Sequence, residues 1–211
     1  MKTIFLDIDE TCVYSYPKKS YYNIINNDKP IEFMNPQTKY MKQRHEEIGD
    51  RLLHLNVDNG YVVLPRPGLE EFLNRYSDCN IYVLSSAAIS GYLDKIIPHY
   101  NIPAIDVFST RKVDRFAQVG IKAGIFDKST NSFISNNWCL IDDNLPYDRQ
   151  LGMKFHVIGV PITKYNTAGF QDDDYQWCRI DPWYGGPDNN VLNLKSKVLN
   201  ATIRMYLTTD D

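Results

Sequence analysis

The strongest constraint on the fold is the alternation of short apolar stretches with segments of helical periodicity. The apolar stretches have the length of strands and are expected at residues 3–6, 61–64, 81–84, 105–108, 138–141 and 155–160. Apolar residues then recur every three or four positions, which indicates helices at residues 69–76, 89–100 and 189–207. Strands that alternate with helices predict an α/β fold, with a mostly parallel central sheet flanked by helices.

The composition is typical of a folded chain of ordinary size. Of its 211 residues, 43% are hydrophobic and 23% are charged, which allows a sizeable core and excludes a disordered chain. The formal net charge of −3 provides no global basic field that would recruit nucleic acid, although a local basic patch stays open. No stretch approaches the roughly 18 apolar residues of a membrane-spanning helix. We expect a single domain over residues 1–211.

The cysteines and the amino-terminal residues indicate a reducing compartment. Cys12, Cys79, Cys139 and Cys178 lie far apart and form no CxxC pair, which favours buried thiols over disulfides or zinc ligands. The apolar run near the amino terminus stops after three residues, so it lacks the core of a signal peptide. The sequence therefore predicts a cytoplasmic protein, or a nuclear one if its source has a nucleus.

Residues 14–61 interrupt the alternation with an irregular, tyrosine-rich and basic segment. Within it, residues 38–55 could form a helix. We expect an inserted flap or cap after the first strand rather than a second core domain. Its basic part, residues 17–44, is either a solvated surface or a grip for a phosphorylated polymer.

Polar residues that could carry chemistry directly follow three of the expected strands. They are Asp7, Asp9, Ser85, Ser86, Asp142 and Asp143. In an open parallel sheet the carboxyl ends of the strands share one edge, where ligands bind. Carboxylates packed together repel one another, and a bound cation is the usual relief. Because the ligands are oxygens with no histidine or cysteine nearby, the four aspartates predict magnesium rather than zinc.

These residue types fit the hydrolysis of a phosphate ester. Asp7 could attack the phosphoryl group as a nucleophile and form an aspartyl-phosphate. Asp9 lies two residues further on, where it could protonate the leaving group and later deprotonate the attacking water. A hydroxyl and a lysine would hold the remaining phosphoryl oxygens. The sequence therefore predicts a magnesium-dependent phosphomonoesterase.

The same residues resemble the motifs of a known family. Asp7-Ile8-Asp9-Glu10-Thr11 resembles the DxDxT signature of the haloacid dehalogenase (HAD) superfamily. Residues 64–73, with their Arg-Pro-Gly helix start, and residues 143–146 are similar to the small C-terminal-domain (FCP/SCP-like) phosphatases that act on RNA polymerase II tails. The resemblance covers roughly residues 1–160 and implies a Rossmann-like HAD fold and phosphatase activity.

The resemblance implies a role for each residue of the first motif. Asp7 would be the nucleophile and Asp9 the general acid and base. Thr11 would brace the loop, and the backbone carbonyl of Ile8 would contribute a metal ligand.

The later motifs imply further roles, with two alternatives left open. The hydroxyl after the second catalytic strand would be that of Ser85, or of Ser86 if the strand runs one residue longer. The lysine ahead of the last catalytic strand would be Lys128, 14 residues before Asp142, or else Lys122. The residues that secure magnesium would be Asp142 and Asp143, helped by Asn144.

The sequence leaves several classes of substrate open. The resemblance favours a phosphoprotein or phosphopeptide. The alternatives are a nucleotide or polynucleotide end phosphatase, whose aromatic flap would stack a base, and a non-catalytic phosphate-binding module on a HAD scaffold. Residues 14–61 are longer than the flap of the polymerase-tail phosphatases. Residues 162–211, expected to be an extension packing on the core, match no motif of the family.

Overall fold

The computed structural model of the chain describes residues 1–57, 59–87, 89–109, 115–130, 132–143, 176–189 and 191–207. The strand expected at residues 155–160, the acidic run at residues 172–174 and Asn144 lie outside them. No helix in the described ranges is both long and apolar enough to cross a membrane.

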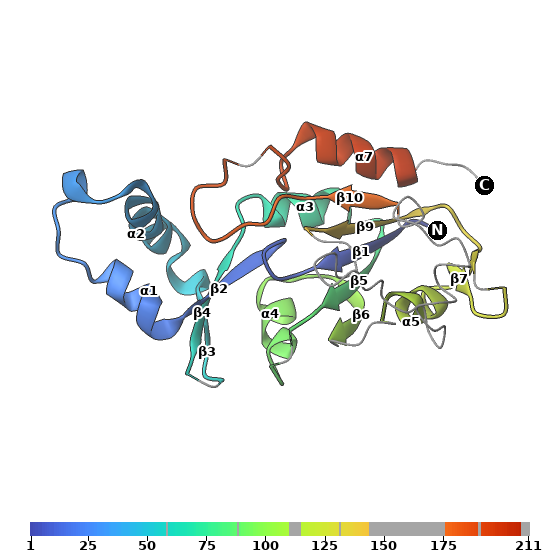
Figure 1. Cartoon of the computed structure of the whole chain (residues 1–211), viewed down its shortest axis with the longest axis horizontal. Coiled ribbons are helices and arrows are strands. Elements are labelled where there is room, and N and C mark those ends of the chain that lie inside the picture. The colour runs from blue at the N-terminus through green and yellow to red at the C-terminus, as the bar shows by residue number, and fades with distance from the viewer. Residues whose placement is uncertain are drawn as a thin grey trace, which may run out of the picture.

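A five-stranded parallel sheet forms the centre of the fold (Figure 1). Its strands, in spatial order, are β10 (Trp177–Arg179), β9 (Trp138–Asp142), β1 (Thr3–Asp7), β5 (Asn80–Ser85) and β6 (Ala104–Ser109). The pairings of β1 with β5 and with β9 are both parallel, so the direction in which strands are added changes at β1. Ligands bind beyond the carboxyl ends of strands at such a switch point.

Helices cover both faces of this sheet. Every residue of β1 is buried, as a central parallel strand requires. Ile4 and Leu6 face one apolar cluster, and Phe5 faces another. The first cluster is completed by α3 (Leu69–Arg75), α4 (Leu93–His99) and α7 (Lys197–Leu207). The second is completed by α5 (Arg115–Lys122) and the hairpin of β7 (Phe126–Asp127) and β8 (Ser132–Phe133). The predicted α/β fold with a mostly parallel sheet is confirmed.

The chain between β1 and α3 builds a second, smaller core. An antiparallel sheet has the order β2 (Val13–Pro17), β4 (Tyr61–Pro65) and β3 (Leu53–Leu55). The helices of this region are α1 (Lys18–Ile25), α2 (Pro36–Ile48) and the 3₁₀ turns η1 (Ile31–Phe33) and η2 (Gly49–Arg51). Their buried side chains, such as Tyr21 and Met41, form one cluster with Trp183 from the segment after β10.

The bounds of two expected helices and the sheet assignment of one strand need correction. The helix expected at residues 38–55 ends at Ile48, because Gly49 takes a left-handed φ of +51° and the chain turns into η2 and β3. Its start is set by Asn35, whose side chain accepts a hydrogen bond from the Thr38 amide at 2.8 Å. The strand at residues 61–64 is confirmed, but it belongs to the small antiparallel sheet. The last helix begins at Lys197 rather than near residue 189.

Candidate active site

Three carboxylates converge at the carboxyl edge of the central sheet. Asp7 ends β1 and Asp142 ends β9, and both side chains are buried. Asp143 follows directly and is partly buried. Each of the three offers an oxygen that lies within 4.8 Å of the oxygens offered by the other two. The structure thus brings together three of the four aspartates that were predicted to hold magnesium.

The cluster carries more negative charge than its surroundings support. Burial, and then repulsion from Asp142, Asp9 and Asp143, raises the pKa of Asp7 well above the ordinary value of 3.8, and Thr11 opposes this rise. Burial also raises the pKa of Asp143, with a contribution from Asp9. Each shift means that the site favours the neutral acid more than water does, and a bound positive charge would oppose this.

The cluster fits a magnesium ion in both geometry and donor type. Its potential ligands are all carboxylate oxygens, the donors that magnesium prefers, and they lie close enough together to share one ion. A bound cation would also relieve the repulsion that raises the pKa of Asp7. The predicted cofactor is therefore compatible with the residues that are present.

Asp9 lies apart from that cluster because two hydroxyl groups hold its carboxylate. Ser85 Oγ donates to Asp9 Oδ2 at 3.0 Å, and the hydroxyl of Tyr92 donates to Oδ1. Tyr92 also shares a 2.6 Å hydrogen bond with Ser15, and the Ala87 amide donates to Ser85 Oγ at 3.0 Å. Asp9 is thus positioned by Ser85 and Tyr92 rather than grouped with the other carboxylates.

Ser85 and Ser86, the two candidates for the phosphate-binding hydroxyl, lie in different surroundings. Ser85 is the last residue of β5 and is fully buried beside Asp9, whereas Ser86 follows the strand and is exposed. The sequence places Tyr92 only within the helix expected at residues 89–100. Its hydrogen bond to Asp9 spans 83 residues of the chain, and no local pattern signals such a contact.

The loop after Asp7 folds back on itself. The Ile8 carbonyl accepts hydrogen bonds from the amides of Cys12 at 2.8 Å and Val13 at 3.0 Å, so both lone pairs of this oxygen are engaged. The expectation that Ile8 supplies a metal ligand through its carbonyl is therefore wrong. Glu10 has a left-handed φ of 63°, which turns the chain sharply inside this loop.

Thr11 lies in the same loop with a fully buried side chain. Its hydroxyl has no hydrogen bond of ordinary geometry, yet it lies close enough to the Asp7 carboxylate to lower the pKa of that group. Its expected role as a brace for the loop stays a prediction.

A buried arginine connects this loop to the segment after β10. The guanidinium of Arg66 donates to the two carboxylate oxygens of Asp188 at 3.0 and 3.2 Å and to the Asp181 carbonyl at 2.8 Å. It also reaches the carbonyls of Glu10 at 3.5 Å and Thr11 at 3.4 Å. The sequence indicated Arg66 only as part of a helix start, so this supporting role was missed.

The described contacts do not bring the two candidate lysines to the acidic cluster. Lys128 is exposed in the turn between β7 and β8. This hairpin stacks on Trp138, the first residue of β9, about 13 Å along the strand from Asp142. Lys122 pairs with Asp106 near the start of β6. The phosphate-binding role of Lys128 therefore stays a prediction.

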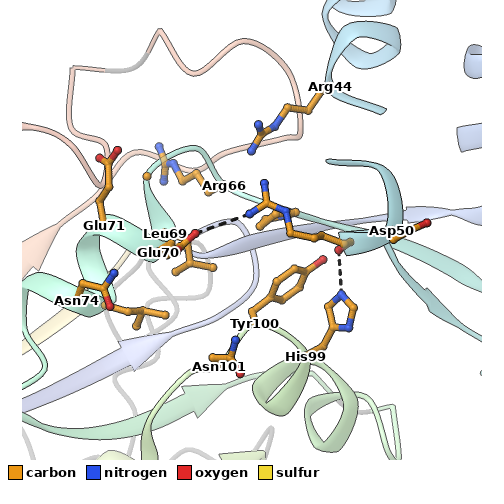
Figure 2. Close-up of a pocket in the computed structure, with 14 residues that line it drawn as sticks. Arg44, Asp50, Arg66, Leu69, Glu70, Glu71, Asn74, His99, Tyr100 and Asn101 are labelled. Carbon is orange, nitrogen blue, oxygen red and sulfur yellow. Dashed lines mark hydrogen bonds and ion pairs between the residues drawn. The ribbon is translucent and has the colours of Figure 1, made fainter. Parts of the chain in front are cut away.

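A pocket of about 630 Å³ lies between α3, η2 and the end of α4. Figure 2 shows Arg44 and Tyr100 extending toward it from opposite sides. None of the residues predicted for catalysis or metal binding lines this pocket. Only Arg66 is shared with the supports of the acidic site, so we do not assign the pocket to catalysis.

Comparison with protein families gives one match. The model of the NLI interacting factor-like phosphatase family matches residues 2–174, which is more than half of the chain. The resemblance to FCP/SCP-like phosphatases of the HAD superfamily is thereby confirmed. No curated protein matches the chain.

Two solved structures to which the chain is similar are both phosphatases named Fcp1. One is the RNA polymerase II CTD phosphatase Fcp1 of fission yeast bound to beryllium fluoride, with a TM-score of 0.48, 12% identity, and coverage of 98% of this chain and 50% of that chain. The other is Fcp1 described as an essential RNA polymerase II CTD phosphatase, with a TM-score of 0.46, 11% identity, and coverage of 97% and 61%. The chain spans about half the length of the first and three fifths of the second.

Proposed function

Since this chain belongs to the NLI interacting factor-like phosphatase family, we propose that it is a magnesium-dependent phosphomonoesterase acting through an aspartyl-phosphate on Asp7. Membership of the family makes the chain a HAD-type phosphatase. The observation that carries the finer proposal is the convergence of Asp7, Asp142 and Asp143 within 4.8 Å at the carboxyl edge of the sheet.

In the first half of the reaction, a carboxylate oxygen of Asp7 attacks the phosphorus atom. The bond between phosphorus and the ester oxygen breaks, and the departing oxygen takes a proton from Asp9. Ser85 and Tyr92 hold the Asp9 carboxylate in one orientation, so its proton can be directed at the leaving group. The alcohol leaves, and the phosphoryl group stays on Asp7.

In the second half, water attacks the phosphorus atom of the aspartyl-phosphate. Asp9, now ionised, removes a proton from that water, and the bond from phosphorus to Asp7 breaks to release phosphate. Asp7, Asp142 and Asp143 would hold the magnesium ion, which supplies positive charge that offsets the repulsion between a carboxylate and a phosphate. Release of the phosphate leaves Asp7 as an ionised carboxylate, ready for the next substrate.

The substrate we propose is a phosphoprotein or phosphopeptide, on the strength of the family. We further propose that residues 14–61 act as a cap that selects the substrate. They follow the catalytic loop directly in the sequence and form a small core of their own. Trp183, from the proposed carboxyl-terminal extension, packs into this core. The extension would thus contribute to the same face of the molecule.

Hydrolysis of p-nitrophenyl phosphate tests the proposal. We expect the wild-type protein to turn over this ester with magnesium and not with EDTA. Asp7→Asn should show no turnover, while its circular dichroism spectrum shows that the fold is unchanged. Asp9→Asn should slow alkyl phosphates more than p-nitrophenyl phosphate, because a poor leaving group depends more on the proton. Full activity of Asp7→Asn would show that the nucleophile is assigned wrongly, and an equal loss for all esters in Asp9→Asn would exclude the acid role.

A further inference from the structure

An exposed aromatic ring in the segment that contacts the catalytic loop has no part in the mechanism above. Tyr184 is 54% exposed, although the neighbouring Trp183 is only 2% exposed. It belongs to the segment between β10 and α7, which runs toward β2 in Figure 1. Tyr184 lies outside residues 2–174, so the family match assigns it no role.

The backbone around Tyr184 is fixed on both sides. The Trp183 amide donates to the Glu10 carbonyl at 2.7 Å, and the Tyr16 hydroxyl donates to the Tyr184 carbonyl at 2.9 Å. Gly185 has φ +74°, and a Cβ atom there would lie 2.5 Å from the ring of Tyr16. This segment therefore rests directly on Tyr16 and on the loop that follows Asp9, so the Tyr184 ring is presented in a defined place.

A second ring completes an aromatic corner. The ring of Tyr14, on β2, meets Tyr184 edge to face, with centroids 6.0 Å apart and planes at 89°. Burial, and then the negative charges of Glu10 and Asp143, raises the pKa of Tyr184. The corner formed by Tyr14 and Tyr184 is thus near enough to Asp143, a member of the acidic cluster, for its negative charge to act on Tyr184.

We propose that Tyr184, supported by Tyr14, binds a ring in the leaving group of the substrate and so selects phosphate esters with a ring next to the ester oxygen. This inference rests on the proposed phosphatase activity. When the phosphate lies at the acidic cluster, its leaving group must extend away from these three carboxylates, and the segment that carries Tyr184 is hydrogen-bonded to the loop that follows Asp9. An aromatic ring presents a large apolar face and has few rotamers to lose on binding, which suits it to stacking against another ring.

Two esters that differ in the ring but not in chemistry test this inference. Benzyl phosphate and ethyl phosphate have leaving alcohols of similar acidity, so their intrinsic reactivities are matched. We expect the wild-type protein to prefer the benzyl ester in kcat/KM. In Tyr184→Ala the ratio of kcat/KM for the benzyl ester to that for the ethyl ester should fall about 3- to 10-fold, mainly through KM. Tyr184→Phe should restore the ratio.

Ile134→Ala provides the control, because Ile134 is also an exposed apolar residue, at 62%, but lies just after β8 and outside the proposed cap. Its ratio should equal that of the wild type. If Tyr184→Ala leaves the ratio unchanged, or lowers both esters equally, the ring-binding role is wrong while the phosphatase proposal stands. If the wild-type protein hydrolyses neither ester, the phosphatase proposal itself fails. It also fails if Asp7→Asn hydrolyses the esters as fast as the wild type does.

Discussion

Tyr92 donates its hydroxyl hydrogen bond to the carboxylate of Asp9, across 83 residues of sequence. Because Ser85 donates to the other oxygen, the carboxylate is held from two sides. The acid of the proposed reaction is therefore held in one orientation before any substrate arrives. This arrangement gives the first prediction.

Tyr92→Phe should lower kcat about tenfold for alkyl phosphates and less for p-nitrophenyl phosphate. A hydrogen bond to a charged group contributes about 1.5–3 kcal/mol, and part of that contribution here keeps Asp9 oriented. Tyr100→Phe is the control, since the partly buried Tyr100 also donates its hydroxyl hydrogen bond, to the backbone carbonyl of Val63 at 2.8 Å. If the two variants lose activity equally, and equally for all esters, Tyr92 does not position the acid.

The second prediction concerns pH and the metal-free protein. Asp7 has a higher pKa in the folded protein than in the unfolded chain, so it binds its proton more tightly when folded. Its contribution to stability is complete below the ordinary pKa of 3.8 and is lost as the pH rises through the raised folded-state value. In EDTA, the free energy of unfolding of the wild type relative to Asp7→Asn should therefore fall with rising pH.

Urea denaturation between about pH 4 and pH 8 measures this difference. Magnesium should reverse the trend, because it binds the deprotonated carboxylates and so stabilises the folded protein most at neutral pH. A difference between the two proteins that does not change with pH would contradict the raised pKa of Asp7. A lack of stabilisation by magnesium would argue against the metal site.

The third prediction concerns the buried pair of Arg66 and Asp188. Their side chains are 0% and 7% exposed, so Asp188→Asn leaves a buried guanidinium without its counter-charge. We expect a loss of about 3 kcal/mol or more in the free energy of unfolding, measured with urea. Glu71→Gln breaks the exposed ion pair with Lys195 and should cost about 0–1 kcal/mol. If Asp188→Asn and Glu71→Gln lower the free energy of unfolding equally, the buried ion pair of Arg66 contributes no more to stability than an exposed one.

The fourth prediction compares two glycines with positive φ. Gly185→Ala should cost about 2–4 kcal/mol, because the new Cβ would meet the ring of Tyr16 at 2.5 Å in addition to the backbone strain. At Gly49, with φ +51°, nothing lies within 4 Å of the added Cβ, so Gly49→Ala should cost only the strain, about 1 kcal/mol. Thermal denaturation of both variants is the measurement. If Gly185→Ala costs no more stability than Gly49→Ala, the segment around Gly185 shifts freely away from Tyr16.

The parts of the site that could be predicted are those encoded by local patterns. Asp7, Ser85 and Asp142 each end an apolar stretch of strand length, and the geometry of parallel sheets brings such strand ends to one edge. This general rule is why residues far apart in the chain could be placed together from the sequence alone.

The supports of the site could not be predicted, because they depend on pairings that leave no local trace. Arg66 and Asp188 are 122 residues apart, and Asp188 lies in a segment with no regular structure. The small antiparallel sheet was missed for a related reason. Its β3 has only three residues, and β2, Val-Tyr-Ser-Tyr-Pro, contains no continuous apolar run within a segment of irregular pattern.

The central position of β1 has a consequence for how the protein becomes active. Thr3 pairs with Asn80 on one side and Trp138 on the other, so both borders of the strand are closed by segments distant in sequence. Pairings of this kind are slow to form during folding. Until β9 has docked, Asp142 is not beside Asp7, and the carboxylate cluster does not exist. Magnesium affinity should therefore appear late in refolding, which makes the ion a reporter of the completed sheet.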